Sequence, residues 1–229
     1  MALVLSGGTG SRMGRPKQFI ELLEVPALLY TLRAFQEAPD VGRIYVVGDH
    51  ARIENLVEEA GISKYAGSAP PGESRSLSTR SGLIMLEEAP ETIVLVHDGS
   101  RCLVTPDLVR RVVAAALQDP RADGVIPALP VPDTTKVVEN ETVLETLDRA
   151  KLYAVQTPQA FRLGSLSEAY AASEERLRAA TDDASLVEKA GGRVLVVAGE
   201  KTNIKLTSPE DLILAEAILG ARARTGTRA

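Results

Sequence analysis

The chain is short of residues that several classes of protein depend on. Its 229 residues include one cysteine, Cys102, no tryptophan, and only 3% aromatic residues. A single cysteine cannot form a disulfide within the chain, so nothing points to an oxidising compartment. The scarcity of aromatic rings disfavours the base-stacking surfaces with which proteins bind single-stranded nucleic acid.

An excess of basic residues is also missing. The chain has 26 Lys and Arg against 31 Asp and Glu, a net charge of -5. General nucleic-acid binders need a broad basic surface, so we expect no nucleic-acid partner. No apolar run approaches the length of a membrane span, and the start MALVLSGG lacks the pattern of an export signal. We therefore expect a cytoplasmic protein with no membrane partner.

The apolar residues that are present, 45% of the chain, predict one domain over residues 1–229. Short β-branched runs alternate with helical patterns, which predicts an α/β fold with a mostly parallel sheet covered by helices on both faces. Thr105-Pro106 and Ser208-Pro209 are typical helix starts, and the tail 221–229 lacks a cap, which predicts fraying. The expected strands are 2–5, 44–47, 92–96, 124–128 and 194–197.

One stretch, 131–152, alternates like two strands about a turn at 139–141 and contains no helix long enough for a crossover. We interpret it as a β-arm that projects from the sheet. Such an arm has little core of its own, so we expect a homodimer that buries it. Its apolar side chains include Val137, Val138, Val143 and Leu147.

The first predicted strand runs into the glycine-rich loop LSGGTGSRMGRPKQF. Glycines after a first strand let backbone N–H groups approach an anion closely. The dinucleotide fingerprint fails at Met13, where its third glycine should stand, and a Walker loop is excluded because Lys17 follows Pro16. What remains is either a surface turn with solvated charges or a loop whose Arg12 and Lys17 reach one polyphosphate.

Two later segments have chemistry of their own. Asp98 ends an apolar run, which places its carboxylate at the ligand-binding edge of a parallel sheet; it is either a Mg²⁺ ligand or a turn former before Gly99. Residues 72–78, GESRSLS, open a helix and either bind a base and ribose or simply cap that helix. We expect His97 to be structural and Cys102 to be packed, since neither has the partners of a nucleophilic triad.

The first loop resembles the signature loop of the nucleotidyltransferases that activate sugar phosphates and related compounds. Later segments narrow the resemblance to the methylerythritol phosphate cytidylyltransferases of non-mevalonate isoprenoid synthesis. These segments follow one another in the same order as in that family, and together with the first loop they span nearly the whole chain. These segments are GESRSLS (72–78), VHDGSR (96–101), DTTK (133–136), TPQAF (157–161), TDDAS (181–185) and NIKLTSPEDL (203–212).

The resemblance implies a Rossmann-like nucleotidyltransferase sheet and transfer of a cytidylyl group from CTP to methylerythritol phosphate. It also implies an arm cation that enters the neighbouring subunit's site. By this resemblance the catalytic residues are Arg12, Lys17, Arg149 and Lys205, and Asp98 binds Mg²⁺. The substrate-binding residues it implies are Ser6, Gly7, Gly8, Gly10, Gly72, Glu73, Arg75, Ser78, Gly99 and Thr157.

The chain departs from the family pattern at small residues and at Glu73, where related sequences commonly have Asp. Two other functions stay open. One is the same chemistry on another alcohol phosphate, such as ribitol phosphate. The other is a non-catalytic nucleotide-binding protein, whose mark would be the loss of Arg12, Lys17 or Asp98, all of which are present.

Overall fold

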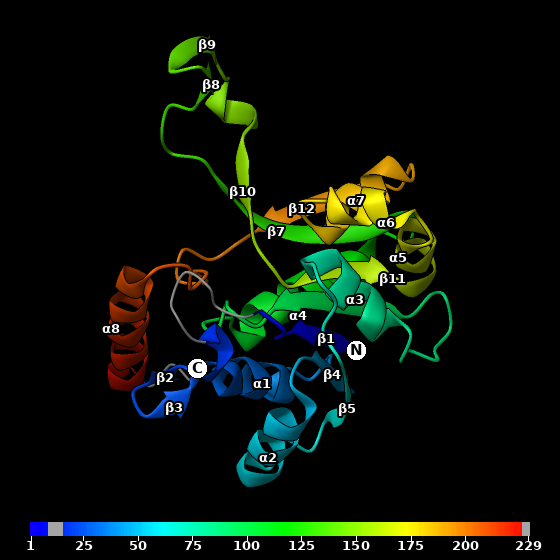
Figure 1. Ribbon diagram of the computed structural model, residues 1–229, viewed down its shortest axis with the longest axis vertical. Helices are drawn as coiled ribbons and strands as arrows, with labels where there is room; N and C mark the ends of the chain where they lie inside the picture. Colours follow the sequence, from blue (N-terminus) through cyan, green and yellow to red (C-terminus); the bar gives the residue numbers. More distant parts are fainter. Residues whose placement is uncertain (9–15, 226–229) are drawn as a thin grey trace.

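The fold is built on an eight-stranded mixed sheet with the order β10-β7-β11-β6-β1-β4-β5 and with β12 beside β7 (Figure 1). A computed structural model describes residues 1–8 and 16–225 of the chain. The strands are β1 (Ala2–Leu5), β4 (Ile44–Val47), β5 (Tyr65–Ala69), β6 (Ile93–Asp98), β7 (Gly124–Pro130), β10 (Tyr153–Val155), β11 (Gln159–Arg162) and β12 (Val194–Ala198).

The predicted α/β architecture and its five strands are confirmed. β1, β4, β5 and β6 pair in parallel, as do β7 and β12. β10 and β11 run antiparallel to their neighbours and were not predicted, and β11 separates β6 from β7. The sheet is therefore mostly parallel, with two antiparallel strands on the side away from β5.

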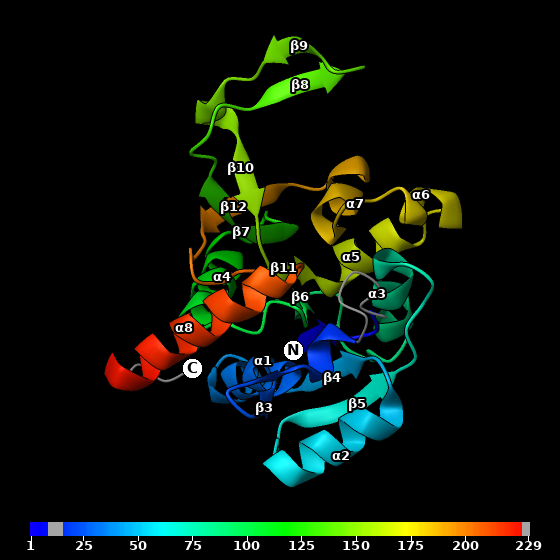
Figure 2. The ribbon, with the colours of Figure 1, turned by 60° about the vertical axis from the view of Figure 1, so that its left-hand side comes forward.

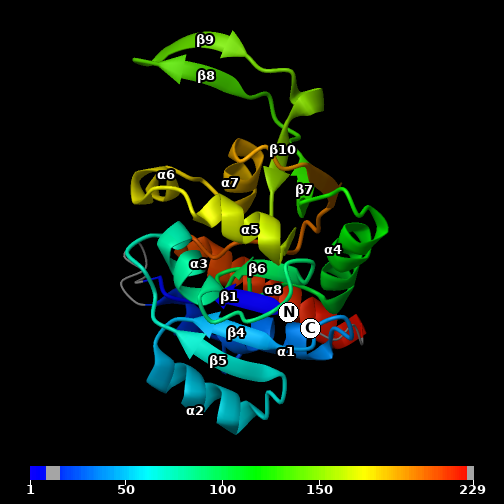
Figure 3. The ribbon, with the colours of Figure 1, turned by 90° about the vertical axis from the view of Figure 1, so that its right-hand side faces the viewer.

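Helices cover both faces of the sheet. Side chains alternate along β1: Ala2 and Val4 pack on one face and Leu3 on the other, all three 0% exposed. Full burial of such side chains contributes about 1.5–3 kcal/mol for a valine or leucine. The first face carries α1 (Ala27–Glu37), α2 (His50–Ala60) and α4 (Pro106–Gln118). The second face carries α3 (Arg75–Leu83), α5 (Leu163–Tyr170), α6 (Glu174–Arg178) and α7 (Asp183–Lys189). Figure 3 shows the helices of the second face gathered on one side of the strands, away from α4.

A third apolar cluster lies under the last helix, α8 (Pro209–Thr225), which Figure 2 shows along the outside of the molecule. This helix contacts a short hairpin, β2 (Glu21–Leu22) and β3 (Val25–Pro26), which follows η2 (Lys17–Phe19). The prediction of a frayed tail is wrong as far as Thr225, because Arg222 is buried and donates hydrogen bonds to the Leu103 carbonyl and the Thr202 hydroxyl.

The two predicted helix starts are present. Thr105 accepts a hydrogen bond from the backbone N–H of Leu108 at the start of α4, with Pro106 in the first helical position. At the start of α8, Asp211 accepts from the backbone N–H of Ser208 over 2.8 Å. Both contacts satisfy donors that a helix leaves free in its first turn.

The predicted arm is a hairpin of β8 (Lys136–Glu139) and β9 (Thr142–Thr146) that stands well away from the sheet (Figure 1). Asn140 and Glu141 have φ values of 47° and 62°, the left-handed conformation of a tight two-residue turn. The hairpin returns through η3 (Arg149–Lys151) to β10. Its exposed apolar side chains are Val137, Val138, Val143 and Leu144, while Leu147 is half-buried.

Within the described ranges, 1–8 and 16–225, no helix combines the length and the apolar character that crossing a membrane requires.

Candidate active site

A cavity of about 480 Å³ opens at the carboxyl ends of β1 and β6. This is the point where the order of strands reverses, because β1 has β4 on one side and β6 on the other. Open α/β sheets bind ligands at such switch points. Of the predicted site residues, those that line the cavity are Ser6, Gly7, Gly8, Lys17, Gly72, Glu73, Arg75, Ser78, Asp98 and Lys205.

Of the other predicted site residues that the structure describes, Gly99, Arg149 and Thr157 do not line the cavity. Gly10 and Arg12 fall outside the described residues. Gly99 follows Asp98, and a Cβ atom there would come 2.9 Å from the Leu5 carbonyl oxygen, so the ends of β1 and β6 approach closely. Arg149 is on the arm, where its guanidinium donates to the Pro132 carbonyl, and it does not line the cavity of its own chain.

The first loop is held against the cavity by its own side chains. The buried amide of Gln18 donates to the carbonyls of Ser6, over 2.7 Å, and Gly8, over 3.2 Å. At Gly7 a Cβ atom would lie 2.1 Å from the Cβ of Pro71, so a larger residue would push the loop away from the segment before α3. Gln18 stands in the loop motif, but its role as a tether was not predicted.

The opposite wall is the start of α3, as the sequence predicted. Ser74 caps the helix by accepting from the N–H of Leu77. The Ser78 hydroxyl donates to the Ser74 carbonyl over 2.9 Å and accepts from the Gly72 N–H over 3.1 Å, which folds the turn onto the helix. The side chain of Glu73 is 79% exposed and pairs with Arg178 of α6.

Asp98 is a buried carboxylate in the wall of the cavity. Its Oδ1 accepts from Arg75 Nε over 2.7 Å and its Oδ2 from Lys205 Nζ over 2.6 Å. Burial alone would raise the pKa of this carboxyl, but the charges of Arg75 and Lys205 outweigh it and hold the pKa well below its usual range. Asp98 is therefore ionised, and both of its oxygens already face cations.

His97 and Thr157 fix the backbone beneath Asp98. His97 Nε2 donates to the Arg101 carbonyl, so Nδ1 is the acceptor for the Thr157 hydroxyl, 3.0 Å away. The Thr157 oxygen in turn accepts from the Asp98 N–H. Burial lowers the pKa of His97 to about 3, so the ring is neutral, and the prediction of a structural role is confirmed. Thr157 is 5% exposed and uses its hydroxyl inside the protein rather than toward the cavity.

The segment that carries Lys205 is tied to the connection between β10 and β11. The Gln156 amide donates to the Glu200 carbonyl over 2.8 Å and accepts from the Glu200 N–H over 3.0 Å. The Asn203 amide donates to the Thr157 carbonyl over 2.8 Å. The sequence contains both segments next to recognisable motifs, but it gave no signal that Gln156 and Asn203 join them.

The arrangement suits a polyanion. Lys17, Arg75 and Lys205 surround the cavity together with the backbone amides of the first loop and the start of α3, while Asp98 and the exposed Glu73 supply carboxylates. A mostly parallel sheet with such a cavity at its switch point defines an α/β protein that binds an anionic ligand, a class that includes the nucleotidyltransferases.

Comparison with known sequences identifies the family within that class. A sequence model of the family described as 2-C-methyl-D-erythritol 4-phosphate cytidylyltransferase matches residues 1–221. The chain belongs to this family, and it is a nucleotidyltransferase. The class and the family that the motifs predicted are both confirmed.

Relatives and solved structures agree over nearly the whole chain. A protein of that name from Rubrobacter xylanophilus is 64% identical over 228 residues, covering 100% of this chain and 98% of its own. Another, from Geobacillus kaustophilus, is 44% identical and covers 96% and 97%. The crystal structure of the protein of the same name from Thermus thermophilus matches with a TM-score of 0.75 at 32% identity, over 95% of this chain and 98% of that one.

Proposed function

We propose that the cavity binds CTP and transfers its cytidylyl group to 2-C-methyl-D-erythritol 4-phosphate. The products are 4-diphosphocytidyl-2-C-methyl-D-erythritol and pyrophosphate. The observation that carries this proposal is the convergence of Lys17, Arg75, Lys205 and Asp98 on one cavity, in a chain that matches the family over residues 1–221.

The reaction is an attack by an acceptor phosphate oxygen on the α-phosphorus of CTP. A new P–O bond forms, the bond from the α-phosphorus to the bridging oxygen breaks, and pyrophosphate leaves with that electron pair. The acceptor oxygen is already anionic, so no general base is needed. His97 is neutral, and burial raises the pKa of the Cys102 thiol to about 12. Neither side chain therefore has a part in this chemistry.

The barrier is electrostatic, because two anions must meet and negative charge moves onto pyrophosphate. In our proposal the amides of residues 6–8 and Lys17 hold the triphosphate, and residues 72–78 hold the cytidine. Arg12, outside the described residues, has the same proposed role as Lys17. The side chain of Lys205 is 42% exposed and pairs with Asp98. In our proposal Lys205 leaves Asp98 and binds the acceptor phosphate instead.

Mg²⁺ is part of the proposal as a companion of the triphosphate. The described residues contain no group of three or more His, Cys, Asp or Glu side chains that could hold a metal by itself. Mg²⁺ is commonly bound by one or two carboxylates together with substrate phosphates, and Asp98 fits that mode. Bound there, the ion would neutralise phosphate charge, in competition with Arg75 and Lys205 for the Asp98 oxygens.

We further propose that the protein is a homodimer in the cytoplasm, in which each arm completes the other subunit's site. Two features support the dimer. The arm exposes Val138, Val143 and Leu144, which are 54–60% exposed, and Arg149 does not line the cavity of its own chain. The solitary buried thiol of Cys102 suits a reducing compartment.

A pyrophosphate-release assay tests the proposed function. We expect turnover with CTP and methylerythritol phosphate to exceed turnover with ATP or GTP, or with ribitol phosphate as the acceptor. Faster turnover with ribitol phosphate than with methylerythritol phosphate would show that ribitol phosphate is the acceptor. Binding of CTP without turnover on either acceptor would identify a nucleotide-binding protein that is not an enzyme.

A further inference from the structure

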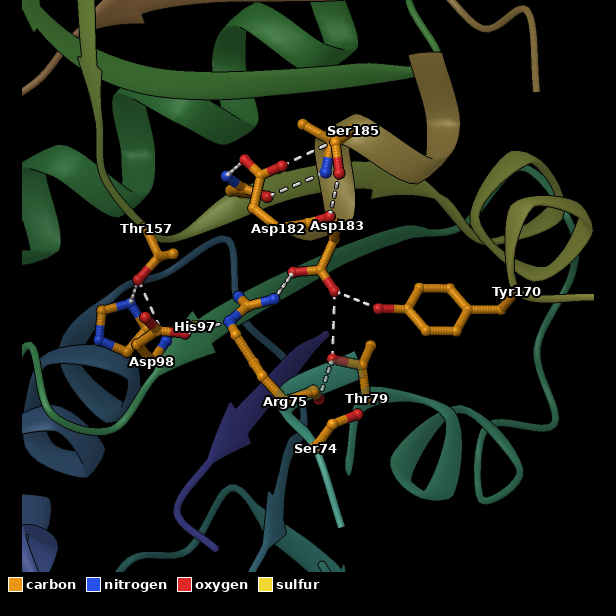
Figure 4. A network of polar contacts seen from close by, with 12 residues as sticks. Ser74, Arg75, Thr79, His97, Asp98, Thr157, Tyr170, Asp182, Asp183 and Ser185 are labelled. Carbon is orange, nitrogen blue, oxygen red and sulfur yellow. Dashed lines mark hydrogen bonds and ion pairs between the residues drawn. The ribbon is translucent and has the colours of Figure 1, made fainter. Parts of the chain in front are cut away.

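A fully buried carboxylate lies behind the cavity wall. Asp183 is the first residue of α7, and its side chain is 0% exposed. It receives three donors: Arg75 Nη1 over 2.7 Å, the Thr79 hydroxyl over 3.1 Å and the Tyr170 hydroxyl over 2.5 Å (Figure 4). A buried charge is tolerated only when it is paired and hydrogen-bonded, and this one is both.

The two oxygens of Asp183 have separate partners. Oδ1 accepts from Thr79 of α3 and Tyr170 of α5, which joins the three helices α3, α5 and α7. Oδ2 accepts from Arg75. One oxygen therefore serves the packing of helices, and the other holds a residue that lines the cavity.

Arg75 connects this buried charge to the site. Its Nη1 points to Asp183 and its Nε to Asp98, and Asp98 in turn pairs with Lys205. The four charges alternate in sign and sum to zero. Arginine has a flexible side chain, and two fixed carboxylates select one of its conformations. Nη2 is buried and has no hydrogen-bond partner within residues 1–8 and 16–225, so the guanidinium is held through Nη1 and Nε.

We infer that Asp183 is a positioning residue for nucleotide binding, a role that rests on the proposed function because CTP is the ligand. Its charge sets the Arg75 guanidinium against Asp98 and fixes the first turn of α3, which follows the turn at Gly72. Without that charge Arg75 has Asp98 as its remaining anionic partner, and the pairing of Asp98 with Lys205 changes with it.

The test compares Asp183→Asn with a matched control, Asp182→Asn. Asp182 is the neighbouring residue; it caps α7 through the Ser185 N–H and accepts from the Gln159 amide, so its bonds lie away from Arg75. Steady-state kinetics and calorimetric titration with CTP give KM and Kd. We expect Asp183→Asn to raise both for CTP by about 10- to 100-fold, the range that follows from misplacing a binding group. Asp182→Asn should keep the wild-type values while losing thermal stability.

A double-mutant cycle separates positioning from general loosening. In an Arg75→Ala background, Asp183→Asn should change the KM for CTP little further, because the residue it positions is gone. Additive effects, or a wild-type Kd in Asp183→Asn, overturn the inference. If Asp183→Asn does not fold, Asp183→Glu takes its place, because it keeps the negative charge but moves it by one methylene group. Its control is Asp182→Glu. Equal KM values for CTP in these two variants would also overturn the inference.

Failure of the proposed function gives a different result. In that case the wild type releases no pyrophosphate from CTP and methylerythritol phosphate. The calorimetric comparison of Asp183→Asn with Asp182→Asn then still tests the positioning role through CTP binding, and a wild type that binds no CTP overturns both proposals.

Discussion

Lys17 joins two parts of the cavity that are 189 residues apart in the chain. Its ammonium group donates to the carbonyls of Leu206 over 3.0 Å and Thr207 over 3.4 Å, directly after Lys205. The first loop and the last segment of the site are thereby held together by a charged group. Lys17 also lines the cavity together with residues 6–8, against whose amides we place the triphosphate.

We predict that Lys17→Met lowers the turnover number by about a hundred-fold, because loss of one well-placed donor at such a centre has that effect. Pyrophosphate release measures it. Lys64→Met is the matched control, since Lys64 also donates to a carbonyl, that of Ala38 over 2.7 Å, far from the cavity. Near-normal turnover in Lys17→Met, with a folded protein by circular dichroism, would remove Lys17 from the mechanism.

For individual residues, the sequence predicted which side chains face the cavity better than it predicted their hydrogen-bond and ion-pair partners. Asp98, Arg75 and Lys205 were expected at the site and lie there. Asp183 was visible only as part of a motif, because its partner Arg75 is 108 residues away and no local pattern encodes that contact. The Thr157 hydroxyl was expected to face a substrate and instead contacts His97 and Asp98.

Among the elements, strands with long β-branched apolar runs were predictable and weakly patterned ones were not. β5 reads YAGSA, and β10 and β11 are short. The insertion of β11 between β6 and β7 is a matter of strand order, on which periodicity gives no information. The arm was predictable because a turn residue pair stands between two alternating runs, and its hairpin is present.

The arm also carries a prediction of its own. A heterodimer of one Lys17→Met subunit and one Arg149→Ala subunit, purified through two different affinity tags, should regain about half of the wild-type turnover. If Arg149 acts in the partner's site, one of the two sites in that heterodimer keeps both cations, since both defects fall in the other.

The parent variants, each as a homodimer, are the controls for this experiment. If Arg149 acts in its own subunit, each site of the heterodimer has one defect and no turnover returns. A protein that stays monomeric at micromolar concentration by light scattering would contradict the proposed dimer outright.

For the whole molecule, the central feature is a local concentration of positive charge in an acidic protein. The net charge is -5, yet Lys17, Arg75 and Lys205 meet at one cavity. Among the described residues that line the cavity, these three cations outnumber the two carboxylates, Asp98 and Glu73, and a local excess of positive charge attracts an anionic substrate whatever the charge of the remaining surface. The sheet positions this cavity, because β1 and β6 both end there.

A crystal structure of the protein with CTP and Mg²⁺ is the most direct test of this claim. We predict ordered triphosphate against residues 6–8 and Lys17, with the cytosine beside residues 72–78. A nucleotide bound elsewhere, with this cavity containing only water, would contradict the account.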